Sequence, residues 1–221
     1  MAHKLTVTEV LSLTHDVKRI RTEKPKDYTF SPGQATEVAL NKKGLTEEKR
    51  PFTFTSLPSD DYLEFVIKSY FDHDGVTKAI DEIKEGDELI VDDAWGAIEY
   101  KGTGVFIAGG AGITPFISIF RDLEKQKEVD GNKLFFSNRT GKDVIMEPYW
   151  EELLGDDFIS TITHEKIEGH ENGMINMEFL KKHVADYSQH FYVCGPDQMV
   201  KDISASLKQL GANPDGIVFE K

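Results

Sequence analysis

Three short motifs carry the residues best able to do chemistry in this chain. They are Arg50-Pro51-Phe52-Thr53, residues 109–115 (Gly-Gly-Ala-Gly-Ile-Thr-Pro) and residues 194–199 (Cys-Gly-Pro-Asp-Gln-Met). In the first motif, Arg50 offers a fixed cation that suits a phosphate group. Phe52 lies two positions further on, so in a strand its ring faces the same side and can meet a flat ligand. Taken alone, this motif also fits an ordinary barrel strand.

The second motif lies between an apolar run at 104–108 and a helical pattern at 115–129. Gly110 and Gly112 allow the backbone to approach a pyrophosphate closely, and the start of the following helix favours an anion. Pro115 suits the first helical turn, where its missing N–H costs nothing. The motif therefore predicts dinucleotide binding, and the alternative is a tight strand–helix turn without a ligand.

The elements that must position these motifs change in kind halfway along the chain. Short β-type runs at 5–12, 36–40, 63–68 and 88–91 predict a sandwich or a barrel, with one helix near 76–83. Strand-type runs at 104–108, 133–136 and 191–194 then alternate with helical stretches at 115–129, 147–154, 176–185 and 197–210. That alternation predicts a parallel sheet with helices on its faces. We therefore predict two domains, residues 1–100 and residues 101–221.

Composition narrows the classes of function. The net charge of −13 argues against nucleic acid as a partner, and the basic residues between 18 and 26 fit mostly solvated surface charge. No run of 18 apolar residues could span a membrane, and residues 1–7 do not look like a signal peptide. A single Cys excludes an internal disulfide and a four-cysteine iron–sulfur cluster, and it fits a reducing compartment. The histidines form no His-x-x-x-His pair, so we expect no bound metal. We also expect the protein to be a monomer in the cytoplasm.

The three motifs, in this order, resemble those of the ferredoxin–NADP reductase superfamily, and the resemblance covers nearly the whole chain. It implies a two-domain β plus α/β protein: an FAD-binding antiparallel Greek-key β-barrel followed by an NAD(P)H-binding α/β domain. Arg50, Phe52 and Thr53 match the family's flavin motif, Arg-x-Tyr/Phe-Ser/Thr. The resemblance implies that the Thr53 hydroxyl hydrogen-bonds the flavin N5, the atom that accepts hydride.

Other segments of the first half add to this resemblance. Lys68 and the turn Gly75-Val76-Thr77 lie where the family holds the flavin pyrophosphate. Gly86-Asp87 and Ala94-Trp95-Gly96 are similar to turns that close the family's barrel beside the flavin. We expect Trp95 itself to pack in the core and not to contact the cofactor.

In the second half, residues 109–115 are similar to the family's Gly-x-Gly-x-Thr-Pro turn, which implies that Thr114 contacts the nicotinamide ribose or ring. A lone Cys at a strand end is usually a small buried hydrophobe. Cys194-Gly195-Pro196 with Met199, however, matches the family's Cys-Gly-Pro-x-x-Met. The match implies that Cys194 approaches the nicotinamide C4, so Thr53 and Cys194 are the expected catalytic residues.

Three further residues concern the dinucleotide and the flavin. Ser137 and Arg139 follow a strand where the adenosine ribose should lie, and they favour the 2′-phosphate of NADPH over NADH, because no acid appears until Asp143. The alternative is that Arg139 only caps its loop. Phe219 lies in the final strand, where the family places an aromatic residue close to the flavin.

The resemblance implies an NAD(P)H-dependent flavin oxidoreductase. Hydride would pass from nicotinamide to FAD, and single electrons would then pass to a separate acceptor, because the chain has no cluster of its own. Flavodoxin or ferredoxin is the leading candidate, with Lys42, Lys43 and Lys49 as the expected docking charges. Two alternatives stay open: a reductase component of a multi-subunit oxygenase or electron-transfer complex, and a non-catalytic flavin-binding regulatory module.

Overall fold

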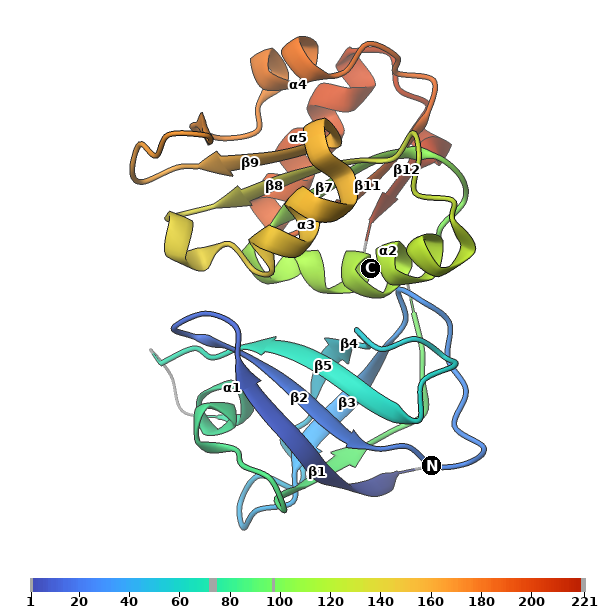
Figure 1. Ribbon diagram of the computed structural model, residues 1–221, viewed down its shortest axis with the longest axis vertical. Coiled ribbons are helices and arrows are strands. Elements are labelled where there is room, and N and C mark those ends of the chain that lie inside the picture. Colours follow the sequence, from blue (N-terminus) through green and yellow to red (C-terminus); the bar gives the residue numbers. More distant parts are fainter. Residues whose placement is uncertain (1, 72–74, 97, 220–221) are drawn as a thin grey trace.

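A computed structural model describes residues 2–71, 75–96 and 98–219 of the chain. Its first half is a six-stranded antiparallel sheet in the order β4-β3-β6-β1-β2-β5, drawn in the lower part of Figure 1. The strands are β1 (His3–Ser12), β2 (Val17–Glu23), β3 (Ala35–Leu40), β4 (Arg50–Thr53), β5 (Tyr62–Lys68) and β6 (Glu88–Val91). A bridge between Phe54 and Phe65 joins the region after β4 to β5, so the sheet nearly closes. The predicted antiparallel barrel is confirmed.

Alternation along the barrel strands separates its interior from its outer surface. Phe54 stacks on Phe30 with ring centroids 4.3 Å apart, and both belong to the barrel core with Phe65. The helix predicted near 76–83 forms as a short α1 (Val76–Ala79) that continues into the 3-10 turn η1 (Ile80–Glu82). Val76 and Ile80 are buried, so this segment closes one end of the barrel.

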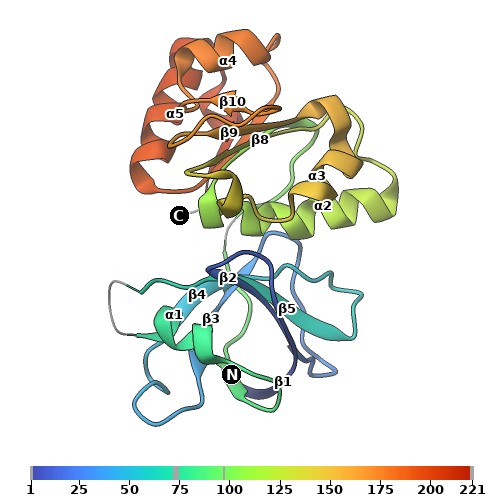
Figure 2. The same cartoon turned by 60° about the vertical axis from the view of Figure 1, so that its left-hand side comes forward.

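The second half is a parallel sheet in the order β10-β9-β8-β7-β11-β12, which confirms the predicted α/β class. The strands are β7 (Gly104–Gly109), β8 (Lys133–Asn138), β9 (Phe158–Ile162), β10 (Glu171–Asn172), β11 (His190–Cys194) and β12 (Ile217–Phe219). The helices are α2 (Thr114–Gln126), α3 (Glu147–Leu154), α4 (Met177–His183) and α5 (Asp197–Gln209). The 3-10 turns are η2 (Gly110–Ile113), η3 (Gly141–Asp143), η4 (Gly155–Asp157) and η5 (Pro214–Gly216). Helices α2 and α3 cover one face of the sheet, while α4 and α5 cover the other (Figure 2).

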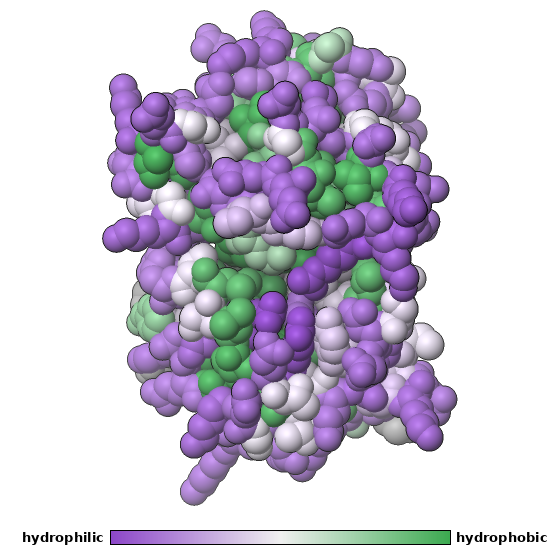
Figure 3. Space-filling model, in the orientation of Figure 1, coloured by the Kyte–Doolittle hydropathy of each residue, from purple (hydrophilic) through white to green (hydrophobic). Residues whose placement is uncertain are grey.

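Helix α2 lies between the parallel sheet and the barrel (Figures 1 and 2). Val17 and Val66, on the outside of the barrel, belong to the same buried cluster as Phe116 and Phe120 of α2. The junction is therefore packed like a protein core and not merely touched by loops. On the face drawn in Figure 3 the surface is mainly hydrophilic, and hydrophobic patches show around the level of this junction.

The segment that connects the two sheets runs from the end of β6 at Val91 to the start of β7 at Gly104. The Tyr192 hydroxyl accepts a hydrogen bond from the Lys101 N–H (2.8 Å) and donates one to the Gly102 carbonyl (2.7 Å). The domain boundary between residues 100 and 101 falls in this segment and stays a prediction. Within the residues described, no helix has the length and apolar character needed to cross a bilayer.

Candidate functional site

Two glycine turns meet where the parallel strands β7 and β11 end. These strands are direct neighbours, with Ala108 opposite Cys194. A Cβ added to Gly112 would lie 2.4 Å from the Cys194 carbonyl oxygen, and one added to Gly109 would lie 2.4 Å from the Met199 sulfur. A side chain at Gly112 would therefore force the two turns apart, whereas one at Gly109 would displace the side chain of Met199.

This meeting point is also where the strand order reverses. From β7 the chain continues to β8 on one side of the sheet, while β11 lies on the other side. In open α/β sheets, ligands bind in the crevice outside the carboxyl ends of strands at such a switch point. The predicted residues Gly110, Gly112, Thr114 and Pro115 from one side and Cys194, Gly195, Pro196 and Met199 from the other all lie at this edge.

The local geometry fits a pyrophosphate. Gly110 has a φ of +53° and open space on the side where a Cβ would lie, so its backbone is accessible there. The turn leads directly into the 13-residue helix α2, which has Pro115 in its first turn. Free N–H groups and the positive end of a helix together favour a bound phosphate. Cys194 is 4% exposed, and Pro196 is the N-cap of α5.

A cavity of about 350 Å³ opens beside this crevice. Its lining residues are Ser137, Thr163, Met174, Ile175, Asn176, Gln198, Met199, Asp202 and Ser206. Ser137 thus lies where the adenosine part of a dinucleotide was predicted, whereas Arg139 is exposed and is not part of this lining. Asp202 was missed by the sequence reasoning. The spacing of Gln198, Asp202 and Ser206, four residues apart on one helix face, was the signal that could have found it.

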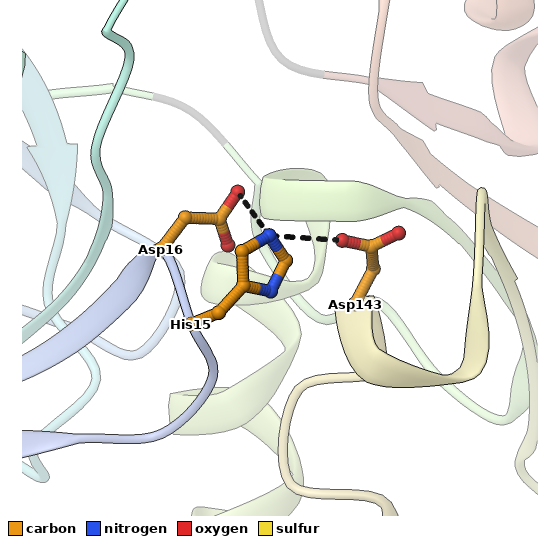
Figure 4. Close-up of side chains that lie close together, drawn as sticks. All are labelled: His15, Asp16 and Asp143. Atoms are coloured by element: carbon orange, nitrogen blue, oxygen red, sulfur yellow. Dashed lines mark ion pairs between the residues drawn. The ribbon is translucent and has the colours of Figure 1, made fainter.

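Asp143, the first acid after β8 in the sequence, caps the turn that follows. Its Oδ2 accepts hydrogen bonds from the Thr140 N–H (2.9 Å) and hydroxyl (2.8 Å), which caps η3. Its Oδ1 lies 3.9 Å from Nε2 of His15, at the end of the β1–β2 hairpin of the barrel (Figure 4). Burial alone would raise the pKa of Asp143, but the Thr140 hydrogen bonds and the charges of Lys68 and His15 hold it below its ordinary value.

The same cluster engages a predicted flavin-binding residue. Lys68 Nζ lies 2.7 Å from Oδ2 of Asp16, and His15 Nε2 lies 3.6 Å from that oxygen. The cluster therefore joins charged groups of both domains, with Lys68 as its cation. Asp16 was not predicted, because it lies far from Lys68 and Asp143 in the sequence and only the pairing of β2 with β5 places Val17 opposite Lys68.

The other predicted flavin residues line the barrel at separate positions. Arg50 is exposed, and its Nη1 donates to the Lys49 carbonyl at 2.8 Å. Thr53 is buried and pairs with Ala35, while Phe52 is half-buried and packs against the barrel core.

The turn at Gly75 was predicted to hold the flavin pyrophosphate through its backbone N–H groups. Gly75 has a φ of +147°, which favours glycine, and it is the N-cap of α1. The Val76 side chain is buried in the barrel core, so only its backbone could contact a cofactor. Thr77, the next residue, is half-buried in the first turn of the helix.

The expectation that Trp95 packs in the core is wrong. The residue is 37% exposed, and its backbone bridges to Ala35 at the start of β3. Asp87, of the predicted Gly86-Asp87 turn, accepts from the Lys84 N–H at 3.1 Å and pairs with Lys42 at 3.0 Å. Phe219 lies opposite Val193 in the last pair of strands.

Comparison with known proteins supports this arrangement. A family model described as an FAD-binding domain matches residues 2–90, and one described as an oxidoreductase NAD-binding domain matches residues 106–205. The chain is 28% identical to the ferredoxin–NAD(P)(+) reductase component of a naphthalene 1,2-dioxygenase system from Pseudomonas putida, covering 97% of this chain and 67% of that protein. It is 29% identical to an NADH-cytochrome b5 reductase 2 from Mycosarcoma maydis, covering 91% of this chain and 63% of that protein.

A solved structure extends the likeness to the whole fold. The ferredoxin NADP+ reductase from Neisseria gonorrhoeae, with bound FAD and NADP, superposes with a TM-score of 0.86 at 22% identity. The match covers 99% of this chain and 98% of that one. The chain therefore combines an FAD-binding domain with an oxidoreductase NAD-binding domain, and it shares the two-domain fold of that reductase.

Proposed function

We propose that this chain is an NAD(P)H-dependent flavin oxidoreductase that passes electrons to a separate acceptor. The observation that carries the proposal is the pair of glycine turns at the carboxyl ends of β7 and β11, packed so closely that a Cβ on Gly112 would clash with Cys194. Such a turn at a topological switch point suits a dinucleotide pyrophosphate. The barrel residues match the flavin motif of the same family.

The chain's own residues have distinct roles in this proposal. When bound, FAD supplies a hydride acceptor that can release electrons one at a time. Arg50 and the backbone at Gly75–Thr77 would hold its pyrophosphate, and the Thr53 hydroxyl would hydrogen-bond N5. The turn at 110–115 would hold the nicotinamide dinucleotide, and Cys194 would line the nicotinamide side of the crevice. The buried junction around Val66 and Phe116 would keep water away from the hydride path.

Cofactor choice rests on residues with opposing charge. Arg139 favours the 2′-phosphate of NADPH, whereas the carboxylate of Asp202 in the cavity disfavours it. The test is an anaerobic titration of the FAD-loaded protein with NADPH and then NADH, followed by flavin absorbance. Bleaching of the flavin by either nucleotide supports the proposal, and a flavin spectrum unchanged by both would contradict it.

A second candidate is a reductase component of a larger complex. Two relatives, from Pseudomonas putida and Mycolicibacterium goodii, are named as reductase components of oxygenase systems, and this chain spans 67% and 63% of their lengths. Ferredoxin and flavodoxin should therefore be compared as acceptors with the same reduced protein. A monomer of cytoplasmic location stays part of the proposal, and sedimentation of the purified protein tests the oligomeric state.

A further inference from the structure

One face of helix α2 makes polar contacts with the barrel along its length. The Ser118 hydroxyl accepts from the Gly33 N–H at 3.0 Å, and Lys125 Nζ donates to the Ser59 hydroxyl at 2.7 Å. Between them, Nη1 of Arg121 donates to the Thr55 carbonyl and to Oε1 of Glu64, each at 2.6 Å. In the central contact the barrel supplies a charged group, the Glu64 carboxylate. In the outer two contacts it supplies neutral groups, the Gly33 N–H and the Ser59 hydroxyl.

Glu64 is an unusual partner, because its side chain is completely buried on the outer side of β5. Its Oε1 also accepts from the Thr55 hydroxyl at 2.9 Å, and its Oε2 accepts from Nε of Arg21 at 2.8 Å. Nε of Arg19 lies 3.6 Å from the same oxygen. Burial would raise the pKa of Glu64, but the charge of Arg121 and the hydrogen bonds from Arg121, Arg21 and Thr55 hold it below its ordinary value. The carboxylate is therefore charged at neutral pH.

The contact between Arg121 and the barrel joins the two segments that are predicted to bind the two cofactors. Arg121 lies about two helical turns after Thr114, in the same rigid helix that begins at the nucleotide turn. Thr55 lies two residues after Thr53, and its N–H donates to the Glu64 carbonyl at 2.8 Å. A shift of α2 against the barrel must therefore change the contacts of Arg121.

We propose that Arg121 is a positioning residue, which fixes the nucleotide-binding helix at one distance from the flavin-binding strand. The inference rests on the proposed function, since it assigns a role in hydride transfer. The apolar packing of Val17 and Val66 against α2 is not directional. Two short hydrogen bonds from one guanidinium, by contrast, allow only one position of α2 along the barrel. A misplacement of about 1 Å between reacting groups can lower a rate roughly a hundredfold.

The test compares the FAD-loaded wild type with Arg121→Met and with Lys125→Met, a matched control on the same helix face. Loss of Arg121 leaves Glu64 paired with Arg21, so the variant should fold and keep its FAD. Anaerobic stopped-flow reduction at saturating nicotinamide should be slower by about one to two orders of magnitude in Arg121→Met. It should stay within about twofold of wild type in Lys125→Met, because that bond is exposed. FAD occupancy and reoxidation of dithionite-reduced enzyme by ferricyanide should match wild type in both.

Arg121→Lys separates positioning from folding, because it keeps the positive charge and replaces the planar guanidinium with an ammonium on a differently shaped side chain. We expect it to recover the melting temperature fully and the hydride-transfer rate only in part. A hydride-transfer rate in Arg121→Met equal to wild type, with a lowered melting temperature, would overturn the inference and assign Arg121 a structural role. Failure of wild type itself to be reduced would instead overturn the proposed function.

Discussion

The barrel and the α/β domain would hold their cofactors by different means. In the barrel, the predicted ligand groups are mostly side chains at or near the surface, such as exposed Arg50 and ion-paired Lys68. In the α/β domain they include backbone groups of a turn in which a Cβ on Gly112 would lie 2.4 Å from the Cys194 carbonyl oxygen. A surface side chain can change without disturbing the fold, but a packed glycine cannot. Substitutions in the first domain should therefore change the affinity for FAD without changing the stability of the fold. Substitutions in the glycine turn of the second domain should change nucleotide affinity and stability together.

Substitution of Glu64 is expected to change the free energy of unfolding more than any other change proposed here. It is an exception to the comparison above, because Glu64 is a side chain of the barrel that is buried and not exposed. Glu64→Gln should lower the free energy of unfolding by about 3 kcal/mol at pH 7, since it leaves the cations of Arg21 and Arg121 without their buried counter-charge. The pKa of Glu64 is lowered on folding, so its contribution is present above pH 4.5 and is lost as pH falls through the folded value. Denaturant unfolding of both proteins from pH 7 to pH 3 should show the difference shrinking at the acid end. A difference that does not change with pH would contradict this assignment.

Arg50→Ala tests the barrel half directly. It should weaken FAD binding by roughly 1.5–3 kcal/mol, the usual contribution of a charge-assisted hydrogen bond. The melting temperature of the FAD-free protein should not change, because Arg50 is exposed and its Nη1 bonds only to the neighbouring Lys49 carbonyl among the contacts described. Isothermal titration with FAD measures the affinity, and Arg50→Lys serves as a control that keeps the charge. Full flavin retention by Arg50→Ala would show that this segment does not hold the cofactor.

Gly112→Ala tests the α/β half. The added Cβ must displace the Cys194 backbone, so we expect about 1–3 kcal/mol of destabilisation together with weaker nucleotide binding. Gly216→Ala is the control, since its Cβ would lie 3.7 Å from the nearest atom, in ordinary contact, and should change stability by no more than about 0.5 kcal/mol. Thermal unfolding and nucleotide titration of both variants check this. A Gly112→Ala protein of normal stability would remove the contrast between the two halves.

Charge reversal at Arg139 and neutralisation of Asp202 test which residues discriminate NADPH from NADH. Arg139→Asp should weaken NADPH more than NADH, and Asp202→Asn should strengthen NADPH relative to NADH. Each change should be about fivefold, since one exposed charge contact contributes on the order of 1 kcal/mol. The ratio of the two KM values is the measurement, and NADH serves as the internal control. Equal effects on both nucleotides would show that neither residue reads the 2′ position.

The smallest effect is expected at the predicted docking lysines. Lys42 is already paired with Asp87 and Lys49 with Asp92 at 2.5 Å, so Lys43 is the exposed charge of the three. Lys43→Glu should slow reduction of an acidic flavodoxin a few-fold at low salt and leave ferricyanide reduction unchanged. The difference should fade as the Debye length falls to about 8 Å at physiological ionic strength. Faster wild-type reduction of flavodoxin at higher salt would mean that net repulsion dominates and that this face does not dock.

Sequence reasoning succeeded where a segment is governed by local pattern. The helix predicted at 147–154 has the same bounds in the structure, and the strand–helix alternation of the second half gave the parallel sheet. It missed β2, because Arg19 and Arg21 were attributed to solvated surface charge. Their side chains are only 21% and 26% exposed, since the outer face of β2 and β5 lies against α2. It also missed β9, whose Ser160 and Thr161 are polar but buried.

The order of the two domain types and the three motifs can be inferred from the sequence alone, because these depend on residue spacing along single elements. Only the tertiary fold brings distant groups together: it pairs Asp16 with Lys68 and Arg121 with Glu64, and it places Asp202 and Ser137 in the lining of one cavity. Each of these pairs joins different elements, so its distance depends on strand register and on how α2 packs against the barrel. A buried charge such as Glu64 cannot be inferred from its neighbours in the chain, because the cations that make its burial tolerable come from β2 and α2.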